Sequence, residues 1–339
     1  MALRDSLHAL VDGRDLTSDE AAAALDEIVT SEEAEPALVS AFLVALRMKG
    51  ETPDEIAGLA RSMRSHAIAV KPARDGLVDT CGTGGDGTGT VNVSTTASFV
   101  VAGAGLPVAK HGNRALSSKA GSADVLEALG VRLDLSAEQV ASCIDTAGIG
   151  FMFAPAFHPA MAKVMPVRRA LGVRTAFNVL GPLTNPARPS YQLVGVGSRE
   201  LGELVAGALA RTEGLTRALV VHGAGGADEL TLAGPNDVWR VEDRTVSHTV
   251  VDPQDTGLDP APLWSLGGGD PASNARRLRE VLEGRPGPVR DCVLLNAGAA
   301  FVAAGAAGDL REGIGLAAKS VDSGDAAAAL ERLIAASSA

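Results

Sequence analysis

The chain has few aromatic residues and few positive charges. Among its 339 residues there are only two Trp, one Tyr and seven Phe. Single-stranded nucleic acids are usually bound by stacking of bases on aromatic rings, so this scarcity argues against such a partner. The 41 acidic residues also outnumber the 30 basic ones, which leaves a net charge of −11. A chain this acidic has no general attraction to nucleic-acid backbones or anionic membranes, and we expect neither as a partner.

Cysteines and long apolar runs are also scarce. Cys81, Cys143 and Cys292 lie far apart and form no C-x-x-C pair, which excludes a zinc cluster or a disulfide framework. The longest uncharged stretch, 87–109, is rich in Gly, Thr, Ser and Asn and contains Pro107, so it is not a membrane span. The opening residues carry charges and lack the apolar stretch of a secretory signal. We therefore expect a cytoplasmic protein.

The sequence nevertheless contains enough apolar residues for a large core. Hydrophobic residues make up 46% of the chain and charged residues 21%, a composition that excludes intrinsic disorder. The length exceeds the roughly 250–300 residues that one core usually supports, which predicts two domains. Residues 1–70 have the pattern of helices only, and Thr17 with Glu20 and Thr52 with Glu55 match the capping box at a helix start. They are predicted to form a small helical domain.

After Gly76 the pattern changes to that of an α/β fold. Short β-branched runs alternate with alanine-rich helical stretches and glycine-rich turns, which is typical of βαβ units. We predict a small all-helical N-terminal domain and a larger α/β domain, residues 73–164 and 191–339, with a mostly parallel central sheet flanked by helices. The segment at about 165–190 is predicted to return to the helical domain. The helix at 37–46 is apolar nearly all round, so it is buried under the second domain or in an oligomer interface.

The first candidate site is the glycine-rich segment CGTGGDGTGTVNVST at 81–95. It follows a predicted strand and leads into a predicted helix, so bare backbone N–H groups and a helix start converge there, as in anion sites. Gly82, Gly84 and Gly87 also match G-x-G-x-x-G, but the next predicted strand ends in Lys110 rather than an acidic residue, which disfavours a dinucleotide site. A purely structural turn is the alternative to a phosphate or pyrophosphate site.

Three further segments carry candidate residues. The segment 110–122, KHGNRALSSKAGS, is either a loop for a multiply charged ligand or a solvated loop, with Ser122 as the predicted cap of the following helix. Asp228 and Glu229 end a glycine-rich turn after a strand, so they are either Mg²⁺ ligands or ordinary surface carboxylates. Arg168 and Arg169 are adjacent on a predicted helix, so at most one of them faces a given cleft.

Five motifs occur in order along the chain: GTGGDGTGTVNVST, VAKHGNRALSSKAGSADVLEALG, MFAPAFHPAM, PVRRALGVRTAFNVLGPLTNPARP and HGAGGADELT. With these motifs the chain resembles the anthranilate phosphoribosyltransferase family of tryptophan biosynthesis. The resemblance implies a pentosyl-transferring glycosyltransferase that moves the 5-phosphoribosyl group from phosphoribosyl diphosphate to the amine of anthranilate and releases pyrophosphate. It also implies Mg²⁺, with two ions per subunit, and a homodimer joined through the helical domains.

The resemblance assigns site residues position by position. The phosphoribosyl-diphosphate site would comprise Gly82, Gly85, Asp86, Thr90, Asn92, Val93, Ser94, Thr95, Lys110, His111, Gly112, Asn113, Arg114, Ala115, Leu116, Ser117, Ser118 and Ser122. The anthranilate site would comprise Gly82, Asn113 and Arg168, with His111 and His158 on its approach. The Mg²⁺ ligands would be Ser94, Asp228 and Glu229. No residue is assigned as a general acid or base.

Two other functions remain to be compared with this one. A pyrimidine-nucleoside phosphorylase shares the expected fold and the anion loop, but it would lack the set formed by Asn113, Arg168 and the Asp228–Glu229 pair. A non-catalytic nucleic-acid-binding relative of the same fold should carry a basic face, which the net charge of −11 disfavours.

Overall fold

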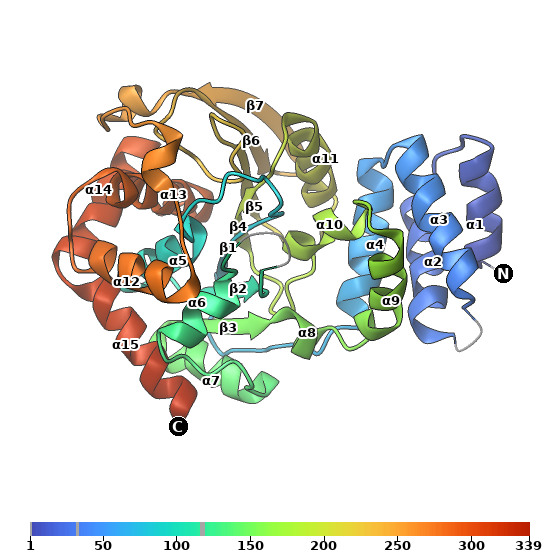
Figure 1. Cartoon of the computed structure of the whole chain (residues 1–339), viewed down its shortest axis with the longest axis horizontal. Coiled ribbons are helices and arrows are strands. Elements are labelled where there is room, and N and C mark those ends of the chain that lie inside the picture. Colours follow the sequence, from blue (N-terminus) through green and yellow to red (C-terminus); the bar gives the residue numbers. More distant parts are fainter. Residues whose placement is uncertain (1, 32–33, 116–118) are drawn as a thin grey trace.

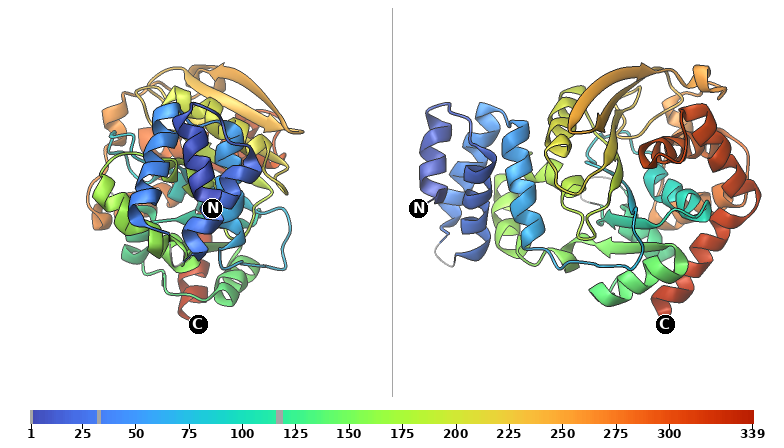
Figure 2. Two further views of the ribbon diagram at one scale, coloured as in Figure 1. Left: turned by 90° about the vertical axis from the view of Figure 1, so that its right-hand side faces the viewer. Right: turned by 180° about the vertical axis from the view of Figure 1, so that it is seen from behind.

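A computed structural model describes residues 2–31, 34–115 and 119–339 of the chain. A helical bundle lies at one end of the molecule, beside a larger domain built on a central sheet (Figures 1 and 2). The two ends of the chain lie far apart, the N-terminus in the bundle and the C-terminus on the far side of the sheet domain (Figure 1). In the described part of the chain, no helix has both the length and the apolar character that crossing a bilayer requires.

The bundle consists of four N-terminal helices. They are α1 (Ala2–Val11), α2 (Ser18–Thr30), α3 (Pro36–Lys49) and α4 (Pro53–Ser65). Both predicted capping boxes are confirmed, because Thr17 and Thr52 each accept the backbone N–H of the glutamate three residues later, and that glutamate accepts the threonine's own N–H. These contacts satisfy amides that the first turn of a helix leaves unpaired.

The larger domain contains one seven-stranded sheet. The order is β3-β2-β1-β4-β5-β6-β7, with β1 to β5 parallel and β6 and β7 antiparallel at one edge. The strands are β1 (Val78–Gly82), β2 (Val108–Gly112), β3 (Ile149–Phe153), β4 (Tyr191–Gly195), β5 (Arg217–His222), β6 (Asn236–Glu242) and β7 (Thr245–Val251). The prediction of a mostly parallel sheet is confirmed.

Helices cover both faces of this sheet. The helices that follow the bundle in the chain are α5 (Val93–Gly103), α6 (Ser122–Ala128), α7 (Ala137–Ala147), α8 (Ala154–Phe157), α9 (Met161–Leu171), α10 (Phe177–Leu180), α11 (Arg199–Ala210), α12 (Pro271–Leu282), α13 (Pro288–Ala304), α14 (Leu310–Asp322) and α15 (Asp325–Ser338), with short 3-10 turns η1 (Gly181–Leu183), η2 (Pro253–Thr256) and η3 (Leu263–Leu266). Side chains alternate along a strand, so Leu219 and Val221 of β5 face the core under α5 and α13, whereas Val220 faces the core under α11.

The segment between β3 and β4 contacts the bundle. Helix α9 packs on α2 and α3, and its Val164 and Val167 belong to the same apolar core as the bundle residues (Figure 1). That core continues through Val194 of β4 and Val220 of β5, because α4 packs directly on α11. The exact domain boundaries stay a prediction, but these contacts hold the bundle against the sheet.

One predicted helix start is wrong by one residue. Gly121, rather than Ser122, occupies the capping position of α6, and its N–H is accepted by the Asp124 carboxylate at 2.9 Å. Ser122 is the first helical residue, and its hydroxyl donates to the Asn113 carbonyl at 3.3 Å. The hydroxyl therefore ties the two ends of the 110–122 loop together instead of capping the helix.

Candidate active site

A cavity of about 1050 Å³ opens at the carboxyl ends of the parallel strands, between the sheet and the α9–α10 segment. It is lined by nearly all of the described residues that the sequence singles out, namely Gly82, Gly85, Asp86, Thr90, Asn92, Ser94, Thr95, Lys110, His111, Gly112, Asn113, Arg114, Ala115, Ser122, His158, Arg168, Asp228 and Glu229. Ligands of open α/β sheets bind at this edge. Which ligand each residue contacts stays a prediction.

One described residue of the predicted set, Val93, does not line the cavity. Val93 is fully buried in the core beneath α5, so its side chain does not reach the cavity. Val93 was predicted as a site residue because it lies inside the glycine-rich motif. Which residues of a helix start face the cavity and which face the core depends on packing, and the motif alone does not show it. Leu116, Ser117 and Ser118 lie outside the described residues.

The glycine-rich loop after β1 presents free amides to the cavity. The Thr83 N–H is accepted by the Gly195 carbonyl at 2.9 Å, and the Gly84 N–H by Asp228 Oδ2 at 2.7 Å. The N–H groups of Gly85 and Asp86 have no acceptor among the described residues. Unpaired amides in sequence on such a loop form a concave donor site for an anion.

Two buried carboxylates face this loop. Asp228 accepts the Gly84 amide, and Glu229 accepts the Ser94 N–H at the start of α5 at 3.1 Å. Burial first, and then the neighbouring Asp86 charge, raises the pKa of Asp228; burial first, and then Asp228, raises the pKa of Glu229. At Gly82 an added Cβ would collide with the Asp228 carboxylate, so the tight approach requires glycine. Two acidic groups held together in this way are suited to a divalent cation.

A buried network beneath the loop joins the predicted residues Lys110 and His111 to Asp79 and Asn185, which the sequence analysis missed. Lys110 of β2 is 2% exposed, and its ammonium donates to the Thr80 carbonyl. Asp79 of β1 is fully buried and accepts the Asn185 side-chain amide at 2.8 Å and the His111 N–H at 3.3 Å. Burial lowers the pKa of Lys110 and raises that of Asp79, while their mutual attraction opposes both shifts.

The cavity lining also includes two neutral imidazoles and one arginine. The rings of His111 and His158 lie 5.1 Å apart. Burial lowers the pKa of His111 to about 3 and that of His158 to about 4, so both are uncharged at neutral pH. The Arg168 guanidinium lies 5.4 Å from the Phe177 ring and 3.9 Å from Met165 Sδ, with no carboxylate partner among the described residues. A half-buried, unpaired guanidinium is suited to bind a ligand carboxylate.

A second missed network joins the two candidate loops from behind. Asn92 donates to the Ala120 carbonyl at 3.1 Å and accepts the side-chain amide of Asn274 at 2.9 Å. Asn274 in turn accepts the Gly269 N–H at 2.7 Å. An Asn-Ala pair in a helix carries no local signal of such a role, so only a comparison of relatives would have indicated it.

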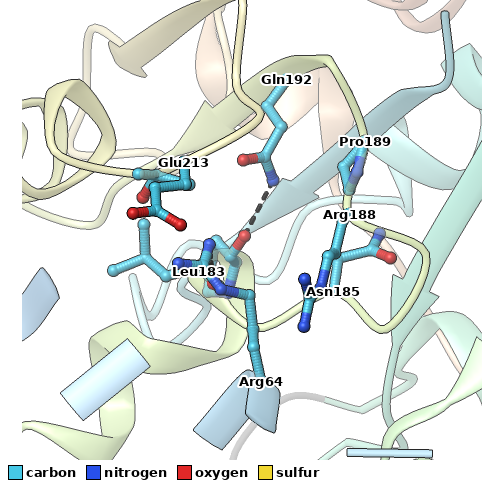
Figure 3. A pocket seen from close by; sticks show the side chains of 9 residues that line it. Arg64, Leu183, Asn185, Arg188, Pro189, Gln192 and Glu213 are labelled. Carbon is cyan, nitrogen blue, oxygen red and sulfur yellow. Dashed lines mark hydrogen bonds between the residues drawn. The ribbon is translucent and has the colours of Figure 1, made fainter. Parts of the chain in front are cut away.

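A second, smaller hollow beside the segment between α10 and β4 is too small for a substrate. It lies between Arg64 of α4, Arg188 and Glu213 (Figure 3). Its volume is about 10 Å³, which is room for about one water molecule. The Gln192 side chain closes one side by donating to the Pro182 carbonyl at 2.8 Å. The large cavity is therefore the candidate active site.

Comparisons with known proteins show the family of the chain. Residues 4–67 match the helical bundle domain of a glycosyl transferase family, and residues 74–327 match its a/b domain. The chain is 55% identical to the anthranilate phosphoribosyltransferase of Chloroflexus aggregans, over 99% of both chains. It is 54% identical to that of Symbiobacterium thermophilum, over 96% of this chain and 95% of the relative.

Solved structures show the same relationship. The anthranilate phosphoribosyltransferase of Thermus thermophilus superposes with a TM-score of 0.93 and 47% identity, covering 99% of this chain and 100% of that one. The enzyme of Saccharomyces cerevisiae, solved in complex with PRPP and Mg, superposes with a TM-score of 0.90 and 31% identity, covering 99% and 98%. With its helical bundle, its α/β domain and similarity along its whole length, the chain belongs to the anthranilate phosphoribosyltransferase family of glycosyltransferases.

Proposed function

We propose that this protein transfers the 5-phosphoribosyl group of phosphoribosyl diphosphate to the amine of anthranilate, giving N-(5-phosphoribosyl)anthranilate and pyrophosphate. One observation carries the proposal: a single cavity has free loop amides and a buried acidic pair at the end formed by the strand-end loops, and an unpaired arginine at the end formed by α9. A diphosphate fits the first end, and a carboxylate fits the second. The family relationship supports the same reaction.

The diphosphate end stabilises the leaving group. The Gly85 and Asp86 amides and the α5 start donate to pyrophosphate oxygens as the bond to C1 of the ribose breaks, with Lys110 beneath them. Preorganised donors of this kind are worth about 3–4 kcal/mol each. The chain segment 110–118 and Ser122 would enclose the ribose phosphate. Because the donors are already in place, little reorganisation accompanies bond breaking.

The donor set at this end fits Mg²⁺. Ser94, Asp228 and Glu229 offer hard oxygen ligands, and within the described ranges no three His, Cys, Asp or Glu side chains form a complete metal site. Mg²⁺ is typically held by one or two carboxylates together with substrate phosphates, so an incomplete protein site is what a substrate-bound ion needs. When bound, Mg²⁺ neutralises diphosphate charge; two ions per subunit are part of this proposal. The yeast relative solved with PRPP and Mg supports it.

The other end positions anthranilate. Arg168 would pair with the anthranilate carboxylate, and Asn113 and Gly82 would contact the ring and amine near the ribose. The neutral His111 and His158 rings add no charge to the approach, which suits an aromatic ring. The amine attacks C1 from the face opposite the pyrophosphate, so the configuration inverts as the C1–O bond breaks, and the nitrogen then loses one proton to water or to the released pyrophosphate. We assign no general base, because a neutral aromatic amine needs only positioning. A yeast relative solved with 4-fluoroanthranilate supports this end of the site.

A fluorescence assay tests the function. Anthranilate fluorescence should fall when the protein, Mg²⁺, phosphoribosyl diphosphate and anthranilate are mixed, and pyrophosphate should appear in equal amount. The signal should require all four components, and Asp228→Asn should serve as the inactive control. Stable fluorescence with freshly folded protein would overturn the proposal.

The same proposal includes a homodimer, the domain boundaries at 70/73 and 164/191, and a cytoplasmic location. Val11 and Met48 support the dimer, because these bundle residues are 70% and 82% exposed in the single chain. The three cysteines are buried and free, as a reducing compartment allows. Light scattering should give the mass of a dimer for the wild type, and Met48→Glu should shift it toward the monomer. A wild-type monomer would contradict the dimer.

A further inference from the structure

Arg174 contacts the glycine-rich loop from the opposite side of the cavity. It lies in the short segment between α9 and α10, and it lines the same cavity as the loop. Its guanidinium donates to the Gly85 carbonyl at 3.2 Å and to the Gly84 carbonyl at 3.4 Å. No carboxylate of the described residues pairs with it, so these two carbonyls are its partners. None of the residue roles drawn above includes it.

The two contacts control the direction of the loop amides. In a trans peptide the C=O and the N–H point to opposite sides. The peptide carbonyls of Gly84 and Gly85 point at Arg174, so the N–H groups that follow, those of Gly85 and Asp86, point away from it. Both of these N–H groups lack an acceptor among the described residues. The guanidinium thus binds the Gly84 and Gly85 carbonyls and leaves the Gly85 and Asp86 N–H groups free to bind a ligand.

The loop is also shaped to receive the guanidinium. Gly84 and Gly85 have φ values of 66° and 71°, a conformation that favours glycine. A Cβ on Gly85 would lie 3.3–3.5 Å from three guanidinium atoms of Arg174, whereas a Cβ on Gly84 would meet nothing within 4 Å. The guanidinium therefore lies on the side of Gly85 where a Cβ would stand, close enough to touch it. A rigid fork of donors suits this task better than an ammonium.

We propose that Arg174 is a positioning residue for the phosphate-binding loop: by holding the Gly84 and Gly85 carbonyls, it directs the Gly85 and Asp86 amides at the diphosphate. The inference rests on the proposed function, because it takes the diphosphate as the loop's ligand. Without the guanidinium, the two peptides are free to rotate, and a carbonyl oxygen turned toward a phosphate would repel it. The positive charge adds attraction for the same anion.

The position of Arg174 also links the loop to the helical bundle. The residue follows α9, which packs on α2 and α3. The loop follows β1 in the centre of the sheet. The contact therefore joins the part of the cavity carried by α9 to the diphosphate end.

The test compares Arg174→Ala and Arg174→Lys with the wild type. The matched control is Arg199→Ala, which removes another exposed arginine, paired to Asp237 at 3.4 Å, outside the cavity. Steady-state rates give kcat and KM for each substrate, and calorimetry with Mg²⁺ and inorganic pyrophosphate gives a dissociation constant without turnover. Arg174→Ala removes both hydrogen bonds that the guanidinium donates to the loop carbonyls. It should therefore lower kcat/KM for phosphoribosyl diphosphate and weaken pyrophosphate binding by about 10- to 100-fold. The KM for anthranilate should change less than about twofold, as expected for an interaction at the other end of the cavity.

Chemical rescue separates positioning from mere structural support. Millimolar guanidinium should restore part of the pyrophosphate affinity of Arg174→Ala, whereas sodium at the same concentration should not, and Arg174→Lys should stay defective. The inference would be overturned if Arg174→Ala bound pyrophosphate with wild-type affinity. It would also be overturned if kcat/KM fell equally for both substrates and guanidinium restored nothing. If the wild type fails to convert anthranilate but binds pyrophosphate, the proposed function fails while calorimetry still decides the role of Arg174. If Arg174→Ala does not fold, Arg174→Lys carries the same comparison.

Discussion

The side-chain amide of Asn274 donates a 2.9 Å hydrogen bond to the side-chain carbonyl of Asn92, although the two residues are 182 positions apart. The bond fixes which end of the Asn92 amide faces the Ala120 carbonyl. Asn274→Asp would place a carboxylate oxygen against the Asn92 carbonyl and so favour a flipped amide. We expect a higher KM for phosphoribosyl diphosphate and a loss of unfolding free energy of about 1–3 kcal/mol, because buried partners lose their hydrogen bonds. Substrate kinetics and urea unfolding measure the two effects.

The neighbouring residue provides a control for this prediction. Ser273 lies on the same helix and outside the network, so Ser273→Ala should change stability by less than about 0.5 kcal/mol. If Asn274→Asp has the wild-type KM, Asn92 does not depend on Asn274 for its orientation.

We expect the buried pair Asp228 and Glu229 to destabilise the metal-free protein. Burial raises the pKa of both groups, and the Asp86 charge raises that of Asp228 further, as the Asp228 charge does that of Glu229. Glu229→Gln keeps an oxygen for the Ser94 amide but removes one charge, so the metal-free variant should unfold at a higher temperature than the metal-free wild type. It should also lose most activity, and Mg²⁺ with pyrophosphate should raise its Tm less than that of the wild type. Thermal unfolding with and without Mg²⁺ tests this; a lower Tm for the metal-free variant would contradict it.

The two buried histidines should make stability depend on pH. Burial lowers the pKa of His111 to about 3 and that of His158 to about 4, below the ordinary value near 6.5. Between these values the unfolded chain binds protons that the folded chain does not, so stability is present above about pH 6.5 and falls as the pH drops. The loss should be about 2 kcal/mol per histidine between pH 6.5 and 5.

Urea unfolding of His158→Phe measures this dependence. The variant should show a shallower loss of stability than the wild type over that pH range. His8→Gln, which alters an exposed histidine, should keep the wild-type slope. Parallel curves for the wild type and His158→Phe would rule out the contribution of His158.

Substitution of Arg168 should weaken the binding of anthranilate and leave the binding of phosphoribosyl diphosphate nearly unchanged. The Arg168 guanidinium lies by Phe177 and Met165 on the α9–α10 segment, whereas the glycine-rich loop follows β1. Arg168→Ala and Arg168→Lys should raise the KM for anthranilate by about 10-fold or more, since Lys lacks the bidentate fork. The KM for phosphoribosyl diphosphate should stay within about twofold for an independent site. A defect confined to phosphoribosyl diphosphate would show that the role is assigned to the wrong residue.

The sequence by itself predicted those features that depend on interactions between residues close together in the chain. The capping boxes at Thr17 and Thr52 depend on contacts over three residues, and the glycine-rich turn after β1 depends on backbone freedom at Gly84 and Gly85. The parallel sheet followed from the alternation of apolar runs with helical stretches. These features could be predicted because the interactions that stabilise them lie within one or two turns of chain.

Packing between distant elements decided the rest. Asp79 and Asn185 meet across 106 residues, and Arg174 reaches Gly85 across 89. Nothing in the local pattern around these residues distinguishes them from an ordinary core carboxylate or a surface arginine. These contacts form only when α9 packs on α2 and α3 and α4 packs on α11. The packing of α5 on the central core likewise buries Val93. A side chain's partner depends on which elements lie beside its own, and that arrangement exists only in the folded chain.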